Sequence, residues 1–438
     1  MANARKQAVN ALVKIYTDEG YSNIVVDKIL ENAELKPIDK AFATSLIYGT
    51  LERKLTLDYV ISNYSKTPIT KIKPFILATL ETALYQILFM DKIPDSAAVN
   101  EAVKLVRSSK LKALGGFVNA VLRSFLRDDK KINYPTDKTK YLSVKYSVSE
   151  EIVKLFISQY EDETEKILTG FFELDGLMLK VNTTKISVEQ LQAELSKKCE
   201  VSVHPLCKEV LVLKGQGSVK ELYGYNEGLF HIQDVASAIC AKIVSSFEGE
   251  RVLDVCAAPG GKSFSIAEYM QNKGEILALD LYEHKVELIK NGAKRLQLNS
   301  IKSFVNDASV YNEKLGEFNK VLCDLPCSGL GILGKKPEIR YKNVAFIDNL
   351  ISLQYDLLQA SKNYVEIGGY LFYSTCTLNK QENILMVKRF LENNDEFEAV
   401  EIAKDIKKCD FDEINTLTLF PHIHKTDGFF ISAFKRVR

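Results

Sequence analysis

Two cysteines stand where a protein could form a covalent bond with its substrate. Cys327 directly follows Asp324-Leu325-Pro326, and Cys376 lies in the segment YSTCT. Each comes at the carboxyl end of a predicted strand, the edge at which open α/β sheets assemble their ligand sites. A lone cysteine is more often inert core packing, whereas two at one edge indicate a nucleophilic site. We expect inert packing for the cysteines elsewhere: Cys199, Cys207, Cys240, Cys323 and Cys409.

A glycine turn ends an earlier predicted strand, in the segment LDVCAAPGGKS at 253–263. Glycines let a ligand approach the backbone, and the helix that follows presents free N–H groups. The Gly-Lys-Ser run is not a phosphate-binding P-loop, because that motif needs glycine where this chain has Cys256. The sequence also has no Gly-x-Gly-x-x-Gly motif, which argues against a nicotinamide or flavin cofactor.

Two aspartates follow the next two predicted strands. Asp280 lies twenty residues after Gly260, where a carboxylate can accept hydrogen bonds from a ribose diol. Asp307 follows the third strand, where a carboxylate can accept from an adenine amino group. A helix N-cap explains a single aspartate equally well. Two in register after a glycine turn predict an adenosine-bearing cofactor.

A thiol beside an adenosine-bearing methyl donor suits methylation of a pyrimidine. Addition of a thiolate to carbon 6 of cytosine makes carbon 5 enamine-like and able to take the methyl group of S-adenosyl-L-methionine. A base then removes the proton from carbon 5, and the thiol leaves by elimination. A thiol with the ordinary pKa of ~8.5 is only slightly ionised at neutral pH, so the site must favour the thiolate. Asp324 is placed to hold or protonate N3 of the ring, which would offset the developing charge.

Metal binding and disulfide exchange are the rival uses of cysteine. Cys323 and Cys327 are four residues apart, and His422 and His424 two apart, without the paired spacing of a structural zinc site. The sequence has no Cys-x-x-Cys pair, so a thioredoxin-like site is not predicted. We therefore expect no metal.

The elements that must position these residues alternate between strand and helix from about Gln233 onward. Such alternation predicts a parallel, doubly wound sheet. Residues 141–232 combine short strand-like runs with a helical run, which predicts a small α+β module. Apolar residues at helical spacing predict an all-α domain for residues 1–135. The main strands of the third domain, 233–438, are expected at 251–256, 275–280, 320–326 and 369–376.

Composition limits the class of protein. The 438 residues are 46% hydrophobic and 26% charged, which excludes a disordered chain and a small disulfide-stapled scaffold. No apolar run approaches the ~20 residues of a membrane helix, and the first residues lack a signal-peptide core. Eight scattered cysteines then indicate reduced thiols, so we expect a cytoplasmic protein.

Charge is unevenly distributed although the formal net charge is only +1. Residues 1–140 carry 22 Lys and Arg against 15 Asp and Glu, whereas the rest carries 36 against 42. Spacings of three and four place several cations on one helical face. This face is either an ordinary solvated surface or, as we favour, a contact for nucleic-acid phosphates. The cations concerned are Lys104, Arg107, Lys110, Lys112, Arg123, Arg127, Lys130 and Lys131.

Taken together, the motifs resemble the RNA cytosine-5 methyltransferases of the NOL1/NOP2/Sun (Fmu) type. The matching segments are CAAPGGK (256–262), DLPCSG (324–329) and YSTCTL (373–378), with HIQDVAS (231–237) and KPEIRY (336–341) beside them. The front half is similar to the helical NusB-like domain of one bacterial branch, through residues 85–107 and 116–123. The resemblance implies a multidomain chain: an all-α NusB-like RNA-binding domain, a small α+β RNA-recognition module, and a Rossmann-like α/β methyltransferase domain. The last is expected to have a mostly parallel seven-stranded sheet, closed by strands at 397–401 and 429–435.

Position by position, the resemblance implies that Cys376 is the nucleophile and that Cys327 resolves the covalent adduct and releases RNA. Leu325 and Tyr341 depart mildly from the family's pattern without removing a functional group. The implied S-adenosyl-L-methionine contacts are Cys256, Ala257, Ala258, Pro259, Gly260, Gly261, Lys262, Asp280, Asp307 and Asp324.

The implied partner is 16S ribosomal RNA, free or in a small-subunit assembly intermediate, and we expect a monomer. A transfer RNA substrate stays open, because the catalytic motifs do not distinguish RNAs. An RNA-binding factor in which methylation is secondary also stays open.

Overall fold

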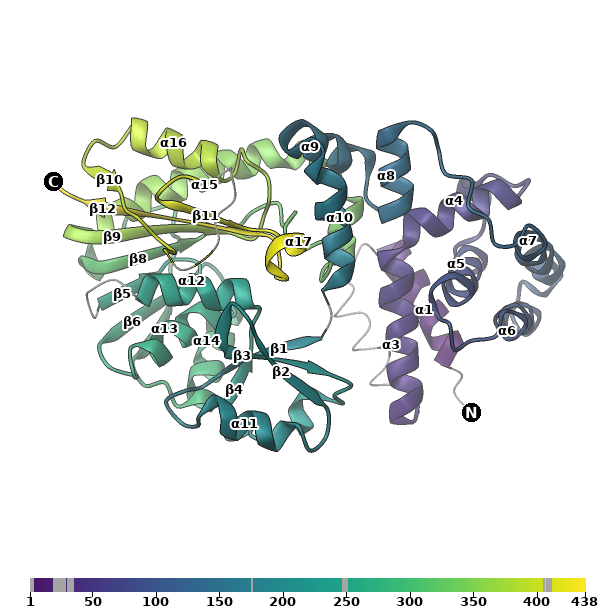
Figure 1. Ribbon diagram of the computed structural model, residues 1–438, viewed down its shortest axis with the longest axis horizontal. Coiled ribbons are helices and arrows are strands. Elements are labelled where there is room, and N and C mark those ends of the chain that lie inside the picture. The colour runs from purple at the N-terminus through teal and green to yellow at the C-terminus, as the bar shows by residue number, and fades with distance from the viewer. Residues whose placement is uncertain are drawn as a thin grey trace. The chain divides into compact units, whose positions relative to one another are not determined.

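The computed structural model describes residues 4–18, 29, 35–174, 176–245, 251–404, 406 and 412–438 (Figure 1). The chain forms two compact units. One, here the helical unit, contains residues 1–161 and 335–344, and the other, the α/β unit, contains 162–334 and 345–438. Within the described part of the chain, no helix has both the length and the apolar character needed to cross a membrane.

The helical unit is all-α, as predicted for the front of the chain. Proline occupies the first turn of α3 and of α5, where its missing N–H has no intrahelical partner to lose. The helices are α1 (Ala4–Asp18), α3 (Pro37–Glu52), α4 (Lys54–Tyr64), α5 (Pro74–Phe89), α6 (Asp95–Arg107), α7 (Gly115–Arg127), α8 (Lys138–Tyr146) and α9 (Glu150–Tyr160). Short 3-10 turns lie at Ile69–Lys71, Lys112–Leu114 and Pro337–Tyr341.

Helix α5 is the centre of this unit. It is apolar around most of its circumference, and such a helix must be buried on several sides. It contributes Leu80 and Leu84 to a cluster with α4, α6 and α7, and Ala78 to a second cluster with α1 and α3. The two clusters make one continuous helical core.

The α/β unit begins with α10 (Glu163–Glu173) and a four-stranded antiparallel sheet of order β2-β3-β1-β4. The strands are β1 (Leu177–Val181), β2 (Glu200–His204), β3 (Cys207–Lys214) and β4 (Phe230–Ile232). Helix α11 (Val188–Leu195) starts with a capping box between Ser187 and Gln190. A 3-10 turn at Val219–Glu221 precedes β4.

The main sheet of this unit has the order β10-β12-β9-β8-β5-β6-β7, with β11 paired to β12. Strands β7, β6, β5, β8 and β9 run parallel, whereas β10, β11 and β12 pair antiparallel. The bounds are β5 (Arg251–Asp254), β6 (Glu275–Asp280), β7 (Ile301–Val305), β8 (Phe318–Asp324), β9 (Val365–Thr375), β10 (Phe397–Ala399), β11 (Thr416–Leu419) and β12 (Phe429–Arg436).

Strand β11 makes this sheet eight-stranded, so the expected count of seven was wrong. The extra strand is only four residues long and is buried at every position. Its residues, Thr-Leu-Thr-Leu, alternate between polar and apolar side chains, but a run of four is the shortest in which such alternation indicates a strand. The predicted fold class is otherwise confirmed.

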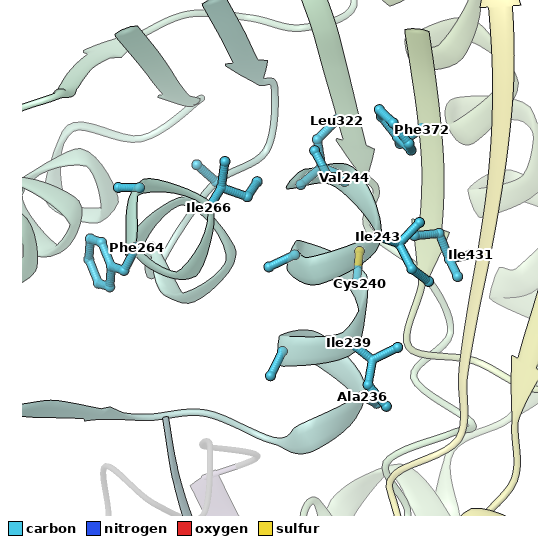
Figure 2. Packing of buried hydrophobic residues seen from close by; sticks show 14 of the residues in the cluster. Ala236, Ile239, Cys240, Ile243, Val244, Phe264, Ile266, Leu322, Phe372 and Ile431 are labelled. Carbon is cyan, nitrogen blue, oxygen red and sulfur yellow. The ribbon is translucent and has the colours of Figure 1, made fainter. Parts of the chain in front are cut away.

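Helices cover both faces of the main sheet. Neighbouring strand residues point to opposite faces, so Phe372 joins the cluster under α12 while Tyr373 joins the cluster under α15 and α16. In Figure 2, the side chains of Ile239 and Ile243 on α12 point toward the strands that carry Ile431 and Phe372. One face carries α12 (Val235–Ser245), α13 (Gly261–Tyr269) and α14 (Glu283–Leu296); the other carries α15 (Ile347–Ser361) and α16 (Ile384–Glu392). Short turns lie at Glu313–Leu315, Val344–Phe346, Lys362–Tyr364 and α17 (Pro421–His424).

The predicted domain ranges stay predictions, and the compact units divide the chain along other lines. Helices α8 and α9 belong to the helical unit, and the four-stranded sheet belongs to the α/β unit. Met178 and Val210 of that sheet lie in the same apolar cluster as α12 and the main sheet. The small sheet therefore shares a core with the main sheet.

Candidate active site

The carboxyl ends of the parallel strands bring the predicted site residues to one edge. Asp254, Asp280 and Asp324 are the last residues of β5, β6 and β8. Cys376 follows the last residue of β9, and Asp307 lies two residues beyond β7. This edge is where doubly wound sheets bind their ligands.

The two cysteines predicted to act meet at this edge. Their Sγ atoms are 3.3 Å apart, and both residues are partly exposed free thiols. The loops that carry them are joined by backbone hydrogen bonds, because Leu325 N donates to Ser374 O at 3.1 Å and Gly331 N donates to Cys376 O at 3.0 Å. The sulfur atoms are therefore held as a pair by the strand ends themselves.

An ion pair stands beside the cysteines. Lys262 Nζ lies 2.6 Å from Asp324 Oδ2, and Ser374 Oγ donates to Asp324 Oδ1 at 2.8 Å. Burial alone would lower the pKa of the Lys262 ammonium, but the Asp324 carboxylate raises it above its usual value, with smaller contributions from Cys240 and Cys376. By reciprocity, the charged ammonium favours a thiolate at Cys376.

The environment of Cys327 favours the neutral thiol. The pKa of Cys327 lies well above its usual range, first because of the hydrogen bond with Cys376, then because of burial and the negative charges of Cys376 and Glu382. A protonated Cys327 can donate to a Cys376 thiolate across the 3.3 Å contact. The geometry thus suits one thiolate and one thiol.

The glycine turn of residues 256–262 leads directly into α13. Gly260 has φ +109°, and a Cβ there would lie 2.3 Å from the ring of Phe264, so only glycine fits. The turn is fixed to the sheet because Ala257 N donates to Leu279 O at 2.7 Å. Helix α13 begins at Gly261, directly after the turn, and the free N–H groups in the first turn of a helix bind a carboxylate or phosphate well.

The residues at this turn fit S-adenosyl-L-methionine. The N-terminus of α13 suits the cofactor's carboxylate, and Asp280, only 6% exposed, suits a ribose diol. Asp280 Oδ1 accepts from Tyr282 N at 3.3 Å and pairs with Lys285 at 3.5 Å. Asp307 is exposed, and hydrogen bonds from the Oγ and N of Ser309 lower the pKa of its carboxyl group. Two carboxylates stand where an adenosine would need acceptors.

The structure therefore groups the predicted residues in two sets. Cys327, Cys376, Asp324 and Lys262 lie in one contact network, although Lys262 was expected among the cofactor contacts. The rest of the turn, Asp280 and Asp307 follow the strand edge away from the cysteines. The individual roles assigned to these residues stay predictions.

The remaining cysteines that the structure describes are not exposed at the strand edge, although Cys240 lies close enough to Lys262 and Asp324 to interact with both. Cys207, Cys240 and Cys323 are buried, and burial raises their pKa values to about 11, 12 and 12. Cys199 is only partly buried, at the edge of the core of the four-stranded sheet, and Cys409 lies outside the described residues. Across the described residues, no three His, Cys, Asp or Glu side chains gather as a metal site requires.

Sequence reasoning missed several polar residues behind the cysteines. Ser374 holds Asp324, and the buried Glu382 binds the backbone and side chain of Ser328. The available signal was a charged residue in the segment QEN shortly after Cys376, ahead of an amphipathic helix.

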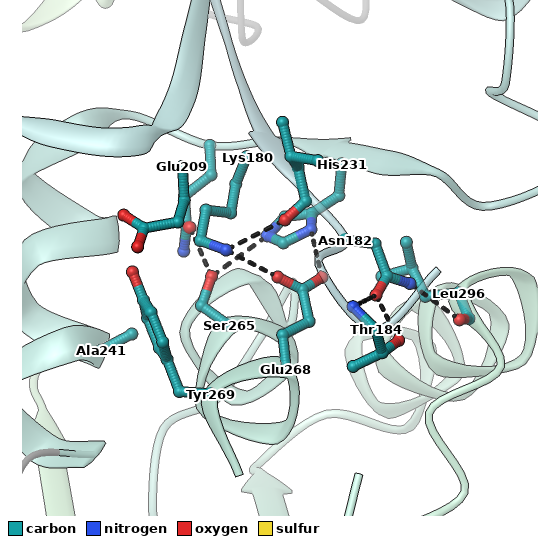
Figure 3. A network of polar contacts seen from close by, with 12 residues as sticks. Lys180, Asn182, Thr184, Glu209, His231, Ala241, Ser265, Glu268, Tyr269 and Leu296 are labelled. Atoms are coloured by element: carbon teal, nitrogen blue, oxygen red, sulfur yellow. Dashed lines mark hydrogen bonds and ion pairs between the residues drawn. The ribbon is translucent and has the colours of Figure 1, made fainter. Parts of the chain in front are cut away.

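A buried polar network fixes the other end of α13 (Figure 3). Lys180 Nζ of β1 lies 2.9 Å from Glu268 Oε2 of α13, with both side chains fully buried. Ser265 Oγ donates to Gln233 Oε1 at 2.6 Å. The four-stranded sheet is thereby bonded to the helix that starts at the cofactor turn.

The helical unit carries a basic pocket of its own. Its volume is ≈ 630 Å³, and its cations are Lys104 and Arg107 of α6 and Arg123 of α7, all exposed. The other lining residues are Asn100, Val103, Ser108 and Asn119. The pocket contains three of the eight cations predicted to form one helical face, and these three come from two helices.

Comparison with known proteins agrees with both units. Residues 241–435 match the family model described as 16S rRNA methyltransferase RsmB/F, and residues 2–127 match the NusB family. The "Probable ribosomal RNA small subunit methyltransferase B" of Bacillus subtilis (strain 168) is 34% identical over 443 residues, covering 99% of each chain. The protein of the same name in Synechocystis sp. (strain PCC 6803) is 34% identical over 447 residues, covering 100% of each.

Among solved structures, PH0851 is similar with a TM-score of 0.83 and 26% identity, over 100% of this chain and 99% of that one. The resemblance noted in the sequence is confirmed. The chain belongs to the ribosomal RNA small subunit methyltransferase B family, whose members are S-adenosyl-L-methionine-dependent RNA methyltransferases.

Proposed function

We propose that this chain methylates carbon 5 of one cytosine of 16S ribosomal RNA, the equivalent of cytosine 967, through a covalent bond between Cys376 and carbon 6. The observation that supports this most is the pair of thiols 3.3 Å apart beside the Lys262–Asp324 ion pair. A surface that only bound RNA would need neither thiol.

The Cys376 thiolate adds to carbon 6, forming the S–C6 bond and making carbon 5 nucleophilic. When bound by the turn at 256–262, Asp280 and Asp307, S-adenosyl-L-methionine would supply an electrophilic methyl group to carbon 5, with its sulfonium sulfur as the leaving group. A base removes the proton from carbon 5, the C5–C6 double bond re-forms, and the C6–S bond breaks to return the thiolate. Lys262 favours the thiolate at the beginning and at the end of this sequence.

Asp324 serves this reaction as a carboxylate. Its contacts with the Lys262 ammonium at 2.6 Å and the Ser374 hydroxyl at 2.8 Å both come from donors, so both of its oxygens act as hydrogen-bond acceptors. The same acceptors suit the exocyclic amino group of cytosine. Of the two roles that the sequence left open, holding the ring is therefore favoured over protonating N3.

The first test is transfer of labelled methyl to unmethylated 16S RNA. Cys376→Ala is expected to abolish transfer while leaving RNA affinity unchanged, because only the nucleophile is lost. Cys199→Ala, which removes a sulfur near the four-stranded sheet, is the matched control and should retain full activity. Full activity of Cys376→Ala would refute the nucleophile assignment.

The second test concerns release of the product. Cys327→Ala is expected to form the S–C6 bond and then fail to resolve it, so a protein–RNA adduct should accumulate as a shifted band on a denaturing gel. Normal turnover without any adduct would remove Cys327 from the release step.

The substrate is tested by bisulfite sequencing of ribosomal and transfer RNA from a strain that lacks this gene. Loss of one methylated cytosine in 16S RNA supports the proposal. Loss confined to transfer RNA would keep the chemistry and replace the substrate.

The basic pocket on α6 and α7 supports a phosphate-binding role for the helical unit. Because neutralised phosphates release counterions, Arg107→Glu with Arg123→Glu should weaken RNA binding and reduce its salt dependence. Lys71→Glu with Lys73→Glu makes the same charge change at exposed positions of the same unit, outside the pocket, and is the control. Equal losses in both double variants would indicate that only net charge matters.

A further inference from the structure

Glu382 is a fully buried carboxylate just behind the cysteine pair, two residues before α16. Its Oε1 accepts from Ser328 N at 2.8 Å and from Gln354 Nε2 at 3.0 Å. Its Oε2 accepts from Ser328 Oγ at 2.6 Å and from Asn379 Nδ2 at 3.0 Å. All four contacts donate to its two oxygens, which matches the acceptor capacity of a carboxylate.

These four hydrogen bonds join segments that are distant in the chain. Ser328 directly follows Cys327, and Asn379 lies three residues after Cys376. Ser328 Oγ also lies 2.7 Å from Thr377 Oγ1, the hydroxyl next to Cys376. Gln354 of α15 anchors the carboxylate from a third side and donates to Pro326 O at 2.9 Å. Glu382 therefore cross-links the two cysteine loops through its side chain, in addition to the backbone hydrogen bonds that join them.

Glu382 also places a negative charge beside one cysteine. The groups that face Cys327 are Cys376 from the end of β9, Glu382 from the start of α16, and the N–H of Gly329 in its own loop. Cys376 and Glu382 both disfavour a Cys327 thiolate, while the N–H of Gly329 acts in the opposite direction. The titratable Tyr373 ring also lies near Glu382 and Cys327, and the pKa of its hydroxyl is raised well above its usual value, first by burial and then by Glu382.

We propose that Glu382 is a positioning residue that sets the spacing of the cysteine pair and assigns their roles, with Cys376 as the nucleophile and Cys327 as the protonated partner. The inference rests on the proposed reaction. A neutral side chain could cross-link the loops, but only a buried charge also discriminates between the two thiols, since like charges in a low-dielectric site repel strongly.

The test measures Cys327 without RNA or cofactor. In a Cys376→Ala background, alkylation of Cys327 by iodoacetamide is followed against pH by peptide mass spectrometry, with and without Glu382→Gln. We expect Glu382→Gln to speed alkylation at pH 8 by about tenfold, because a shift of one pH unit in the titration midpoint is a tenfold change in thiolate. An unchanged midpoint in the folded double variant would overturn the proposal.

Gln354→Met is the matched control, because it removes one hydrogen-bond donor of the same cluster and leaves the charge in place. Its alkylation midpoint should equal that of Cys376→Ala alone. A shift as large as that of Glu382→Gln would show that loosened packing, and not charge, exposes Cys327, and would also overturn the assignment of roles.

Glu382→Asp tests the spacing and serves if Glu382→Gln does not fold. The charge is kept while the side chain is one methylene shorter, so the kcat of methylation should fall at least about tenfold with little change in KM. The alkylation midpoint of Cys327 should stay where it is. Unchanged kcat, or a lowered midpoint, would contradict the proposal.

The experiments distinguish failure of the proposed methylation from failure of the proposed role of Glu382. If the chain methylates no 16S RNA, the alkylation experiments still decide whether Glu382 controls Cys327. If methylation occurs and the alkylation midpoints do not move, the reaction stands and the role of Glu382 falls.

Discussion

Asp254 carries a buried carboxyl group at the end of β5, under the cofactor turn. Burial raises its pKa to about 7, although the hydroxyl of Ser263, which donates to Oδ2 at 2.6 Å, acts to lower it. The folded chain therefore binds a proton that the unfolded chain has already released. Its contribution to stability is complete below about pH 4 and is lost as the pH rises through 7.

We therefore expect Asp254→Asn to flatten the pH dependence of stability. Between pH 5 and pH 7.5 the free energy of unfolding of the wild type should fall more than that of the variant, by on the order of 2 kcal/mol. Urea unfolding of both proteins without cofactor measures the difference. If the free energy of unfolding depended on pH equally in the wild type and the variant, folding would not change the pKa of Asp254.

At this scale, the sequence predicted that the candidate residues share one edge but not which of them are in contact. Cys327, Cys376 and Asp324 were expected there because each lies at, or directly after, the carboxyl end of a predicted strand. The partnership of Lys262 with Asp324 spans 62 positions of sequence, and that of Glu382 with Ser328 spans 54. No local pattern encodes such contacts, because they arise only when neighbouring strands set the register.

Among the structural elements, the loop after β8 leaves almost no room for a larger residue at Gly331. A Cβ on Gly331 would lie 1.9 Å from Gly428 O and 2.8 Å from Cys376 O. Gly331→Ala must therefore push the loop away from the cysteine it supports. We expect a loss of about 1–3 kcal/mol in stability and a clear fall in kcat, measured by urea unfolding and methyl transfer.

Gly217→Ala is the control for that substitution, because a Cβ there meets nothing within 4 Å. It should leave kcat unchanged. Equal effects of the two substitutions would mean that the close approach at Gly331 is relieved without cost.

Helix α13 is the second element whose placement matters, and the Lys180–Glu268 pair holds it. Lys180→Met leaves Glu268 buried without its cation, which costs about 3–5 kcal/mol. We expect a loss of that order in urea unfolding, together with weaker binding of S-adenosylhomocysteine by calorimetry. The double variant Lys180→Met/Glu268→Leu should recover most of the stability, and failure to recover it would exclude a simple ion-pair effect.

Strands and helices were predictable where their apolar periodicity is strong. The range 275–280 matches β6 residue for residue, and 251–256 extends only two residues beyond β5. Strand β11 was missed because only four residues carry its alternating pattern. The buried Lys180 was equally invisible, because a lysine in a strand is ordinarily solvent-facing and its acidic partner lies 88 positions away.

For the whole molecule, the most consequential feature is the path of residues 335–344. They follow the Cys327 loop in the chain, yet they fold as part of the helical unit. Arg340 of this segment is 1% exposed; it donates to Tyr146 O at 2.9 Å and lies 3.5 Å from Glu52. Ser149 N donates to Arg340 O at 2.8 Å, and Tyr341 donates to Leu51 O. The sequence placed KPEIRY beside the active-site motifs, and nothing in its pattern indicates that it completes the all-α core.

The helical unit should therefore depend on a segment that begins 175 positions after the end of α9. Arg340→Ala leaves Tyr146 O and Glu52 without their buried cation, at a cost of a few kcal/mol. We expect scanning calorimetry to show the transition of the helical unit lowered by about 5 °C or more. The unfolding temperature of the α/β unit should not change. Its transition is identified as the one whose temperature rises when S-adenosylhomocysteine is added. Lys336→Ala, an exposed change in the same segment, should move neither transition. If Arg340→Ala lowered only the unfolding temperature of the α/β unit, residues 335–344 would stabilise that unit and not the helical unit. The division of the chain into these two cooperative units would then be wrong.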